Sequence, residues 1–227
     1  MNASDLAEID HLFDHLLSMR PTQRSANVAY YWRNRDLERE RVRSRQHGTV
    51  DLLRDLRSAP CIDCGGRFAP HQMDFDHRDR SDKRFRLTSG AVMLRPTAAI
   101  LEEVAKCDVV CANCQRMRTQ ARKRLAPAAT TRVSPGLERK RAHWRAQARL
   151  LDRLRDVPCQ DCGRRFPPAA MDFDHRIAGS KRSAVSRMIG RAGTARILDE
   201  VAKCDIVCAN CHRLRTFRRR TDESVRE

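Results

Sequence analysis

The feature that most constrains this chain is a duplication in which both copies carry two Cys-x-x-Cys pairs. The segment MDFDHR occupies residues 73–78 and 171–176, and KCDVVCANCQRMRT at 106–119 is nearly repeated as KCDIVCANCHRLRT at 203–216. The Asp-His segment recurs after 98 residues and the second cysteine pair after 97. A repeat this long is a duplicated domain, because solenoid repeats run to roughly 20–50 residues. Each copy must therefore close a core of its own.

The cysteines predict how such small domains are stabilised. Domains of this size commonly need a metal, a disulfide or a partner, and only 5% of the residues here are aromatic whereas 33% are charged. Two Cys-x-x-Cys pairs per copy supply the four thiolates of a tetrahedral structural zinc site. We therefore predict two structural Zn²⁺ ions. The predicted ligands are Cys61, Cys64, Cys111 and Cys114 in the first copy, and Cys159, Cys162, Cys208 and Cys211 in the second.

The alternative for these cysteines is a disulfide framework, which depends on the compartment. The N-terminus (MNASDLAEIDHLFDHLLSMR) has acidic and His residues where a signal peptide needs a basic start and an apolar run. No stretch approaches the ~18–20 continuous apolar residues of a membrane span. A cytoplasmic, reducing location without a membrane partner is expected, which favours zinc. Cys107 and Cys204 lie outside the pairs and are predicted to be buried apolar residues.

The charge predicts a polyanionic partner. The formal net charge is +17 and the pI is near 10.4, so DNA is the expected partner and RNA the alternative. Residues 139–155 are predicted to form a helix with arginine at every fourth position and leucines on much of the remainder. Such a helix would lay its arginines along phosphates; an ordinary solvated face is the alternative. The arginines are Arg141, Arg145, Arg149 and Arg153.

Two helices are predicted ahead of the first copy. Residues 5–19 place their apolar side chains on one stripe. His11 and His15 have the spacing of helical metal ligands, but they lie away from that stripe and are predicted to be solvated. Residues 29–46 are rich in arginine and are predicted to be helical as far as Gly48, which ends the helix.

Each copy is predicted to contain the order knuckle, strand, helix, strand, knuckle, helix. The first strand carries MDFDH, and its alternation places the two aspartates on one face and the histidine on the other. Helices are predicted at 98–106 and 194–203, with a short strand at 205–207. The predicted boundaries are 1–20 for an N-terminal amphipathic helix, 21–58 for a basic helical segment, 59–125 for the first zinc module (module one), 126–136 for a linker, 137–220 for a basic helix plus the second zinc module (module two), and 221–227 for a tail.

An Asp-His pair followed by Cys-x-x-Cys-His resembles the HNH endonuclease family, specifically its zinc-stabilised members, in which two knuckles bracket a ββα-metal site. The resemblance covers residues 159–216, and also 61–119 with one departure. It implies an α+β fold with two tandem ββα-metal modules, each preceded by a basic helix. It also implies metal-dependent hydrolysis of DNA phosphodiester bonds.

The resemblance assigns roles to residues of module two. His175 would be the general base, because the pKa of an imidazole lies near neutrality. Asp174 and His212 would hold one catalytic divalent ion, Mg²⁺, Mn²⁺ or another. The residues expected to contact phosphate are Arg176 and Arg213 at the scissile group, with Lys181 and Arg215 as further nucleic-acid contacts.

The chain departs from the family pattern at two places. Where the family has its middle Asn, this chain has Lys203 followed by Cys204, so a backbone carbonyl is expected to orient His175 instead. Asn210, within the knuckle, is expected to be structural.

The second departure lies in module one. It keeps Asp76 and His77 but has Gln115 where module two has His212. A neutral amide oxygen is a weaker ligand for a divalent ion than an imidazole. Module one is therefore expected to bind zinc and help to hold DNA without hydrolysing it.

The leading hypothesis is a nicking endonuclease with one active centre; double-strand cleavage would need a homodimer or two successive nicks. The first alternative is a non-catalytic zinc-dependent nucleic-acid-binding protein. The second is a zinc-stabilised interaction module whose N-terminal amphipathic helix docks a protein. Joint retention of Asp174, His175 and His212 favours catalysis, because binding alone has no chemical need for all three.

Overall fold

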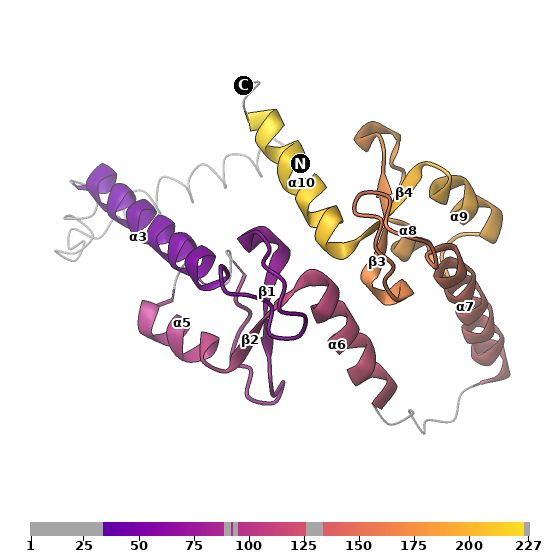
Figure 1. Cartoon of the computed structure of the whole chain (residues 1–227), viewed down its shortest axis with the longest axis horizontal. Helices are drawn as coiled ribbons and strands as arrows, with labels where there is room; N and C mark the ends of the chain where they lie inside the picture. The colour runs from indigo at the N-terminus through magenta and orange to yellow at the C-terminus, as the bar shows by residue number, and fades with distance from the viewer. Residues whose placement is uncertain (1–33, 89–91, 93–94, 126–133, 225–227) are drawn as a thin grey trace, which may run out of the picture. The chain divides into compact units, whose positions relative to one another are not determined.

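A computed structural model describes residues 34–88, 92, 95–125 and 134–224 (Figure 1). The chain divides into two compact units, Met1–Gly48 and Thr49–Glu227, and both modules belong to the second. The predicted helix at 5–19, with His11 and His15, lies outside the described residues. None of the described helices is long and apolar enough to cross a membrane.

The first described helix, α3, runs over Arg35–Leu56. It passes through Gly48, so the prediction that Gly48 ends this helix was wrong. Glycine costs about 1 kcal/mol relative to alanine inside a helix but keeps the hydrogen-bonding groups of its backbone. Beyond it Thr49 and Leu53 are buried, so packing of the C-terminal part offsets that cost.

Module one is built around a two-stranded antiparallel sheet. Met73 lies opposite Cys111 and His77 opposite Cys107, so the register brings the end of the second strand beside the first knuckle. The helix that follows starts directly after the second strand and carries Cys114 in its first turn. The elements are η1 (Pro70–Gln72), β1 (Met73–His77), α5 (Thr97–Val104), β2 (Cys107–Cys111) and α6 (Ala112–Leu125).

Module two repeats this arrangement in the same register, with Met171 opposite Cys208 and His175 opposite Cys204. Its long basic helix starts at Pro135, after Ser134 Oγ accepts a hydrogen bond from the Leu137 amide. The elements are α7 (Pro135–Leu154), η2 (Pro168–Ala170), β3 (Met171–His175), η3 (Ala178–Ser180), α8 (Val185–Met188), α9 (Thr194–Val201), β4 (Cys204–Cys208) and α10 (Ala209–Ser224). The α+β class is confirmed, and the sequence did not predict the short helices η1, η2, η3 and α8.

Each module closes its own core, as the length of the repeat required. In module two, Leu151 of α7 packs with Ile197 of α9 and with Cys204. In module one, Leu53, Ile100 and Cys107 form the equivalent cluster. The prediction that Cys107 and Cys204 are buried is confirmed, and burial raises the pKa of both thiols to about 11.

The two modules contact each other through their final helices: α6 packs against η2, and α10 against η1 and α6. The Asn113 amide donates to Asn210 Oδ1 at 3.3 Å, and the Asn210 amide donates to Asn113 Oδ1 at 3.1 Å. Because each asparagine plays the same role toward the other, the junction has local two-fold character. Asn210 thus takes part in the junction between the modules.

Candidate metal centres and adjoining pocket

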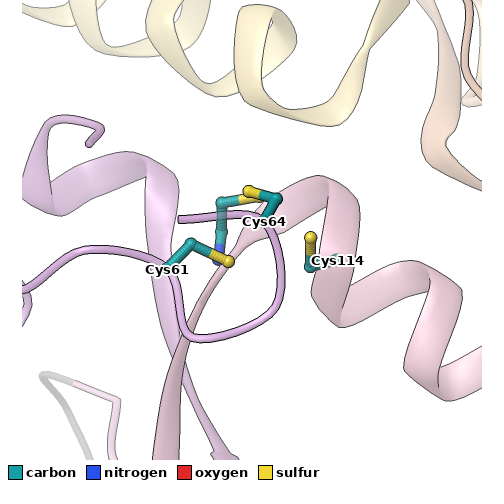
Figure 2. A group of neighbouring side chains, drawn as sticks. Cys61, Cys64 and Cys114 are labelled. Carbon is teal, nitrogen blue, oxygen red and sulfur yellow. The ribbon is translucent and has the colours of Figure 1, made fainter. Parts of the chain in front are cut away.

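Both predicted sets of four cysteines come together as clusters that would hold zinc. In each set the sulfur atoms lie within 4.8 Å of one another. In module one Cys61 and Cys64 lie on the knuckle loop, and Cys114 faces them from α6 (Figure 2). All ten cysteines lie among the described residues, and all are free thiols, so the disulfide alternative is not what the fold adopts.

The surroundings of these thiols suit a cation. The amide of Cys111 donates to Cys61 Sγ at 3.2 Å, and that of Cys208 donates to Cys159 Sγ at 3.2 Å. Burial acts to raise the pKa of Cys61, but such backbone hydrogen bonds lower it to about 7. Burial and the neighbouring thiols raise the pKa of Cys211. Bringing four thiolates together is unfavourable until a divalent ion neutralises them, so the donor set fits Zn²⁺.

Three side chains of module two, Asp172, Asp174 and His212, meet between β3 and α10. Strand alternation turns both aspartates toward α10. His212 Nδ1 lies 2.8 Å from Asp172 Oδ2, and His212 Nε2 lies 3.5 Å from Asp174 Oδ1. Burial acts to raise the pKa of Asp172, but hydrogen bonds involving His212 and Arg116 hold it below its ordinary value. An ionised Asp172 accepts the Nδ1–H, and Nε2 is the ring nitrogen that faces the Asp174 carboxylate.

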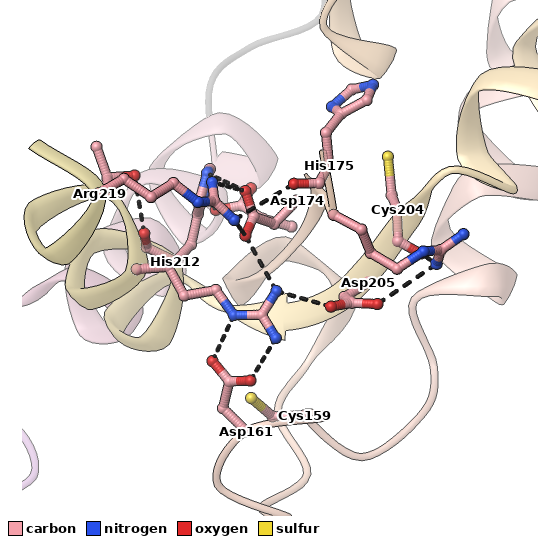
Figure 3. A network of polar contacts seen from close by, with 12 residues as sticks. Cys159, Asp161, Asp174, His175, Cys204, Asp205, His212 and Arg219 are labelled. Carbon is pink, nitrogen blue, oxygen red and sulfur yellow. Dashed lines mark hydrogen bonds and ion pairs between the residues drawn. The ribbon is translucent and has the colours of Figure 1, made fainter. Parts of the chain in front are cut away.

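Asp174 also belongs to an arginine network (Figure 3). Arg219 donates to both of its oxygens, at 2.9 and 2.7 Å, and Arg215 donates at 3.1 Å. Burial acts to raise the pKa of Asp174, but these bonds hold it below its ordinary value. Arg215 further binds Asp161 at 2.8 and 2.5 Å and Asp205 at 2.8 Å. Its guanidinium thus ties the first knuckle to both strands, rather than standing free for the nucleic-acid contact expected of it.

His175 faces the opposite way, and its ring points away from the Asp174 carboxylate (Figure 3). Its Nε2 lies 2.8 Å from Glu200 Oε1, and both side chains are buried. Glu200 also accepts hydrogen bonds from Lys203 Nζ at 2.7 Å and from the Arg182 amide at 2.8 Å. The bond from Lys203 outweighs the opposing effect of burial, and the pKa of Glu200 falls to about 2. The ionised carboxylate therefore accepts the Nε2–H of the ring.

Glu200 is the residue that sequence reasoning missed. We expected a backbone carbonyl to replace the family's amide near Lys203, but a carboxylate one helical turn earlier takes that position. Lys203 binds this carboxylate instead of the imidazole. The repeat held a signal for it, because Glu103 occupies the same place in the first copy. Glu103 of α5 and Glu200 of α9 each lie on the apolar side of a short helix, which indicates that each has a buried polar partner.

A pocket of about 430 Å³ opens beside β3 and α10 in module two. It collects most of the predicted site, and it adds one arginine that belongs to module one. Lys181, predicted to contact nucleic acid, is exposed at this pocket. The lining residues that bear on function are Asp172, Asp174, His175, Lys181, His212, Arg219 and, from module one, Arg116.

The remaining predicted residues fall in different places. Arg176 donates to the Cys204 carbonyl at 2.8 Å and also to the Ala202 carbonyl, so it braces the start of β4. Arg213 donates to Asp74 Oδ2, in module one, at 2.6 Å. Neither lies among the residues that line the pocket. The four arginines of α7, namely Arg141, Arg145, Arg149 and Arg153, are all exposed.

Module one reproduces much of this chemistry. Asp76 accepts two hydrogen bonds from Arg122, at 2.9 and 2.6 Å, and one from Arg118 at 3.2 Å. His77 Nε2 lies 2.8 Å from Glu103 Oε1. Burial acts to raise the pKa of Glu103, but His77 and other hydrogen-bond donors lower it to about 2. The aspartate network and the His–Glu pair are therefore common to both modules.

The modules differ at the residue after the last knuckle. Gln115 Nε2 donates to Thr119 Oγ1 at 3.3 Å within its own helix. His212, at the equivalent place, bridges two aspartates. Asp74, the counterpart of Asp172, is bound by Arg213 instead. Module one thus lacks an imidazole between its two strand aspartates.

No protein-family model, curated protein or solved structure matches this chain. The α+β architecture and the two cysteine clusters therefore stand on the geometry of the chain itself. The HNH-like identity stays a hypothesis, carried by the DFDH and Cys-x-x-Cys-His segments. Function has to be argued from the pocket and its donors.

Proposed function

We propose that the chain is a metal-dependent DNA endonuclease that nicks one strand at the pocket of module two, while module one assists DNA binding. The observation that carries this proposal is the position of His212 between Asp172 and Asp174. One ring nitrogen is held by a carboxylate, and the other faces a second carboxylate at 3.5 Å. A histidine that ligates a metal commonly has its other nitrogen fixed in this way.

Asp174 and His212 would hold the divalent ion. When bound there, Mg²⁺ or Mn²⁺ would stabilise charge on the phosphate and lower the pKa of a coordinated water. The donors fit such an ion, because an unprotonated Nε2 and a carboxylate oxygen repel each other unless a proton or a cation lies between them. Two ligands at roughly 2.1 Å from one ion stand about 3–3.5 Å apart, and the separation here is 3.5 Å.

His175 points away from the Asp174 carboxylate but lines the same pocket, and it would take the proton from the attacking water. Glu200 accepts the Nε2–H, which leaves Nδ1 as the nitrogen that can receive a proton. The carboxylate also stabilises the imidazolium that forms, because its pKa of about 2 keeps it ionised. Glu200 thereby supplies the orientation that the family obtains from an amide.

Cations at the pocket and on α7 would bind the DNA backbone. Lys181 is exposed at the rim, and the arginines of α7 form an exposed basic face. Arg219 binds Asp174 in the free protein, yet its side chain is 41% exposed. A metal ion at Asp174 would displace Arg219, and a DNA phosphate would offer it a new bidentate partner. Metal and DNA are then expected to bind cooperatively.

The alternative, zinc-dependent nucleic-acid binding without catalysis, is favoured by a different observation. The His–Glu pair and the arginine-bonded aspartate occur in both modules, including the one without an imidazole at Gln115. These features therefore have a structural use that is independent of hydrolysis. Both hypotheses require the two zinc clusters and the basic face of α7.

Matched aspartate variants separate the two hypotheses. The zinc-loaded full chain and its Asp174→Asn and Asp76→Asn variants are incubated with supercoiled plasmid in Mn²⁺, Mg²⁺ or EDTA, and DNA binding is followed by gel shift. Both substitutions disturb the same kind of arginine network, so Asp76→Asn controls for the loss of that network. We expect metal-dependent nicking by the wild type and Asp76→Asn only. Shifted but uncut plasmid with all three proteins would favour the binding protein.

A further inference from the structure

The pocket of module two contains one residue from module one. Arg116, on α6, lines the pocket and donates through Nη1 to Asp172 Oδ1. Its side chain is 38% exposed, and that of Asp172 is 18% exposed. The contact joins positions 56 residues apart in the sequence. The pocket is therefore built by both modules.

The contact extends into a relay of four side chains. Arg116 binds one oxygen of Asp172, and the other oxygen of Asp172 lies 2.8 Å from His212 Nδ1. His212 Nε2 in turn lies 3.5 Å from Asp174 Oδ1. Arg116 binds Oδ1 of Asp172, and Oδ2 is the oxygen that faces the imidazole. The relay starts in module one and ends at the two donors proposed to hold the catalytic ion.

The junction between the modules keeps both ends of the relay in place. Asn113 and Asn210 exchange amide hydrogen bonds at the starts of α6 and α10. Arg116 lies one turn after Asn113, and His212 lies two residues after Asn210. Gln72 Nε2 also donates to the Asn210 carbonyl at 3.0 Å. The reciprocal bonds thus fix the two helix starts from which Arg116 and His212 project.

The symmetry-related contact, made by Arg213 and Asp74, does not reach an imidazole. Arg213, the counterpart of Arg116, donates to Asp74 at 2.6 Å. No imidazole continues from Asp74, because Gln115 bonds to Thr119 in its own helix. The two inter-module ion pairs are therefore alike as structural contacts, but only the pair formed by Arg116 is connected to a candidate metal site.

We propose that Arg116 is a positioning residue, supplied by module one, that holds Asp172 and through it His212 for metal binding in module two. The inference rests on the proposed function of that pocket. It gives module one a task beyond holding DNA, since a module two without its partner would lack the residue that orients its imidazole. Arg116 also offsets the charge of Asp172, which favours Asp172 as an orienting group over its acting as a competing metal ligand.

The first test is Mn²⁺ affinity of the zinc-loaded full chain, measured by titration for wild type, Arg116→Gln, Arg116→Lys and Asp74→Asn. Asp74→Asn is the matched control, because it weakens the symmetry-related ion pair between Arg213 and Asp74 at the same junction. We expect Mn²⁺ binding to weaken about tenfold in Arg116→Gln, the scale of losing a group that orients a ligand. Arg116→Lys should recover part of the loss, and Asp74→Asn should stay within about twofold of wild type. Equal losses in Arg116→Gln and Asp74→Asn would reduce Arg116 to a structural contact and overturn the proposal.

The second readout needs neither Mn²⁺ nor cleavage. The ¹⁵N chemical shifts of the His212 ring report which nitrogen carries the proton. The Nδ1 shift of wild type and of Asp74→Asn should be that of a protonated nitrogen, and in Arg116→Gln it should move toward that of an unprotonated one. Unchanged shifts in Arg116→Gln would overturn the proposal whether or not the protein cuts DNA. If the shifts change in Arg116→Gln but no variant and no wild type cuts DNA, the positioning role of Arg116 is supported and the proposed nuclease activity is refuted.

Discussion

Modules one and two share one fold but differ at the residue after the last knuckle, which is Gln115 in module one and His212 in module two. Both have a four-cysteine cluster, an aspartate bound by two arginines and a buried His–Glu pair. Only module two has an imidazole, that of His212, between its two strand aspartates. The comparison separates the parts that stabilise the fold from the part that would bind a second metal.

The shared features show what this fold needs in either role. A buried glutamate bound to histidine, lysine and backbone amides joins the short helix to the first strand of each module. Arg118 and Arg215 join each knuckle to its sheet. These contacts involve charged groups in small cores, so they explain how modules with few aromatic residues hold together.

The largest expected effect is loss of zinc. Cys208→Ser and Cys111→Ser each remove one thiolate, and apparent binding free energies of structural zinc run to about 10–16 kcal/mol. Each variant should bind one Zn²⁺ instead of two and lose the secondary structure of its own module, as followed by metal analysis and circular dichroism. Two zinc ions retained in either variant would remove these cysteines from the ligand sets.

The next effect concerns the buried glutamates. Glu200→Gln and Glu103→Gln should each lower the free energy of unfolding by about 3 kcal/mol at pH 7, because a buried charged partner is lost. The pKa of Glu200 is about 2 in the fold, against an ordinary value of 4.5. Its contribution is therefore complete above pH 4.5 and declines as the pH falls toward 2.

Chemical denaturation of zinc-loaded protein at decreasing pH checks the pH dependence of this contribution. The measurements extend down to the lowest pH at which metal analysis still finds both zinc ions. The gap between wild type and Glu200→Gln should begin to close below about pH 4.5. A gap that widened on acidification would mean that the glutamate is protonated in the fold. Both modules should respond alike, since Glu103 has the same lowered pKa.

The residue that differs between the modules can be exchanged in both directions. His212→Gln makes module two resemble module one, and the nicking rate should fall by about a hundredfold or more, because a metal ligand is lost. Gln115→His places an imidazole between Asp74 and Asp76, so Mn²⁺ titration should find one additional site. Zinc content serves as the control for folding. An unchanged nicking rate in His212→Gln would refute the assigned metal site.

The smallest effect is expected at the junction. Asn113→Ala removes the acceptor of the Asn210 amide, and loss of one such hydrogen bond costs about 1 kcal/mol. Thermal unfolding should show a small decrease in midpoint with both zinc ions still bound. Leu125→Ala, an exposed position near the end of α6, is the matched surface control and should have no effect.

The sequence predicted the fold well because periodicity and cysteine spacing are local signals. The strands at MDFDH, the helix of 139–155 and both cysteine clusters appear where those patterns placed them. Gly48 misled the helix prediction because the packing of Leu53 is a tertiary effect. Helix propensity alone carries no information about such packing.

The site was predicted less completely, because its partners are distant in the chain. Asp174, His175 and His212, predicted from the sequence, line one pocket, but the sequence gave no sign that Arg116 would reach Asp172 from the other module. Arg176 and Arg213 were expected at a phosphate because they adjoin the centre in sequence. In the fold Arg176 donates to the Cys204 carbonyl and Arg213 donates to Asp74 of module one, partners that their positions in the sequence do not indicate.

On the proposal made above, only module two would carry a metal-dependent active site. The most direct test is nicking of supercoiled plasmid in Mn²⁺ and in EDTA by wild type, His175→Ala and His77→Ala. The two variants lose equivalent buried His–Glu pairs, so general destabilisation affects both equally. The account predicts that wild type and His77→Ala nick in Mn²⁺ and that His175→Ala does not. Equal loss in both variants, or full activity in His175→Ala, would contradict it.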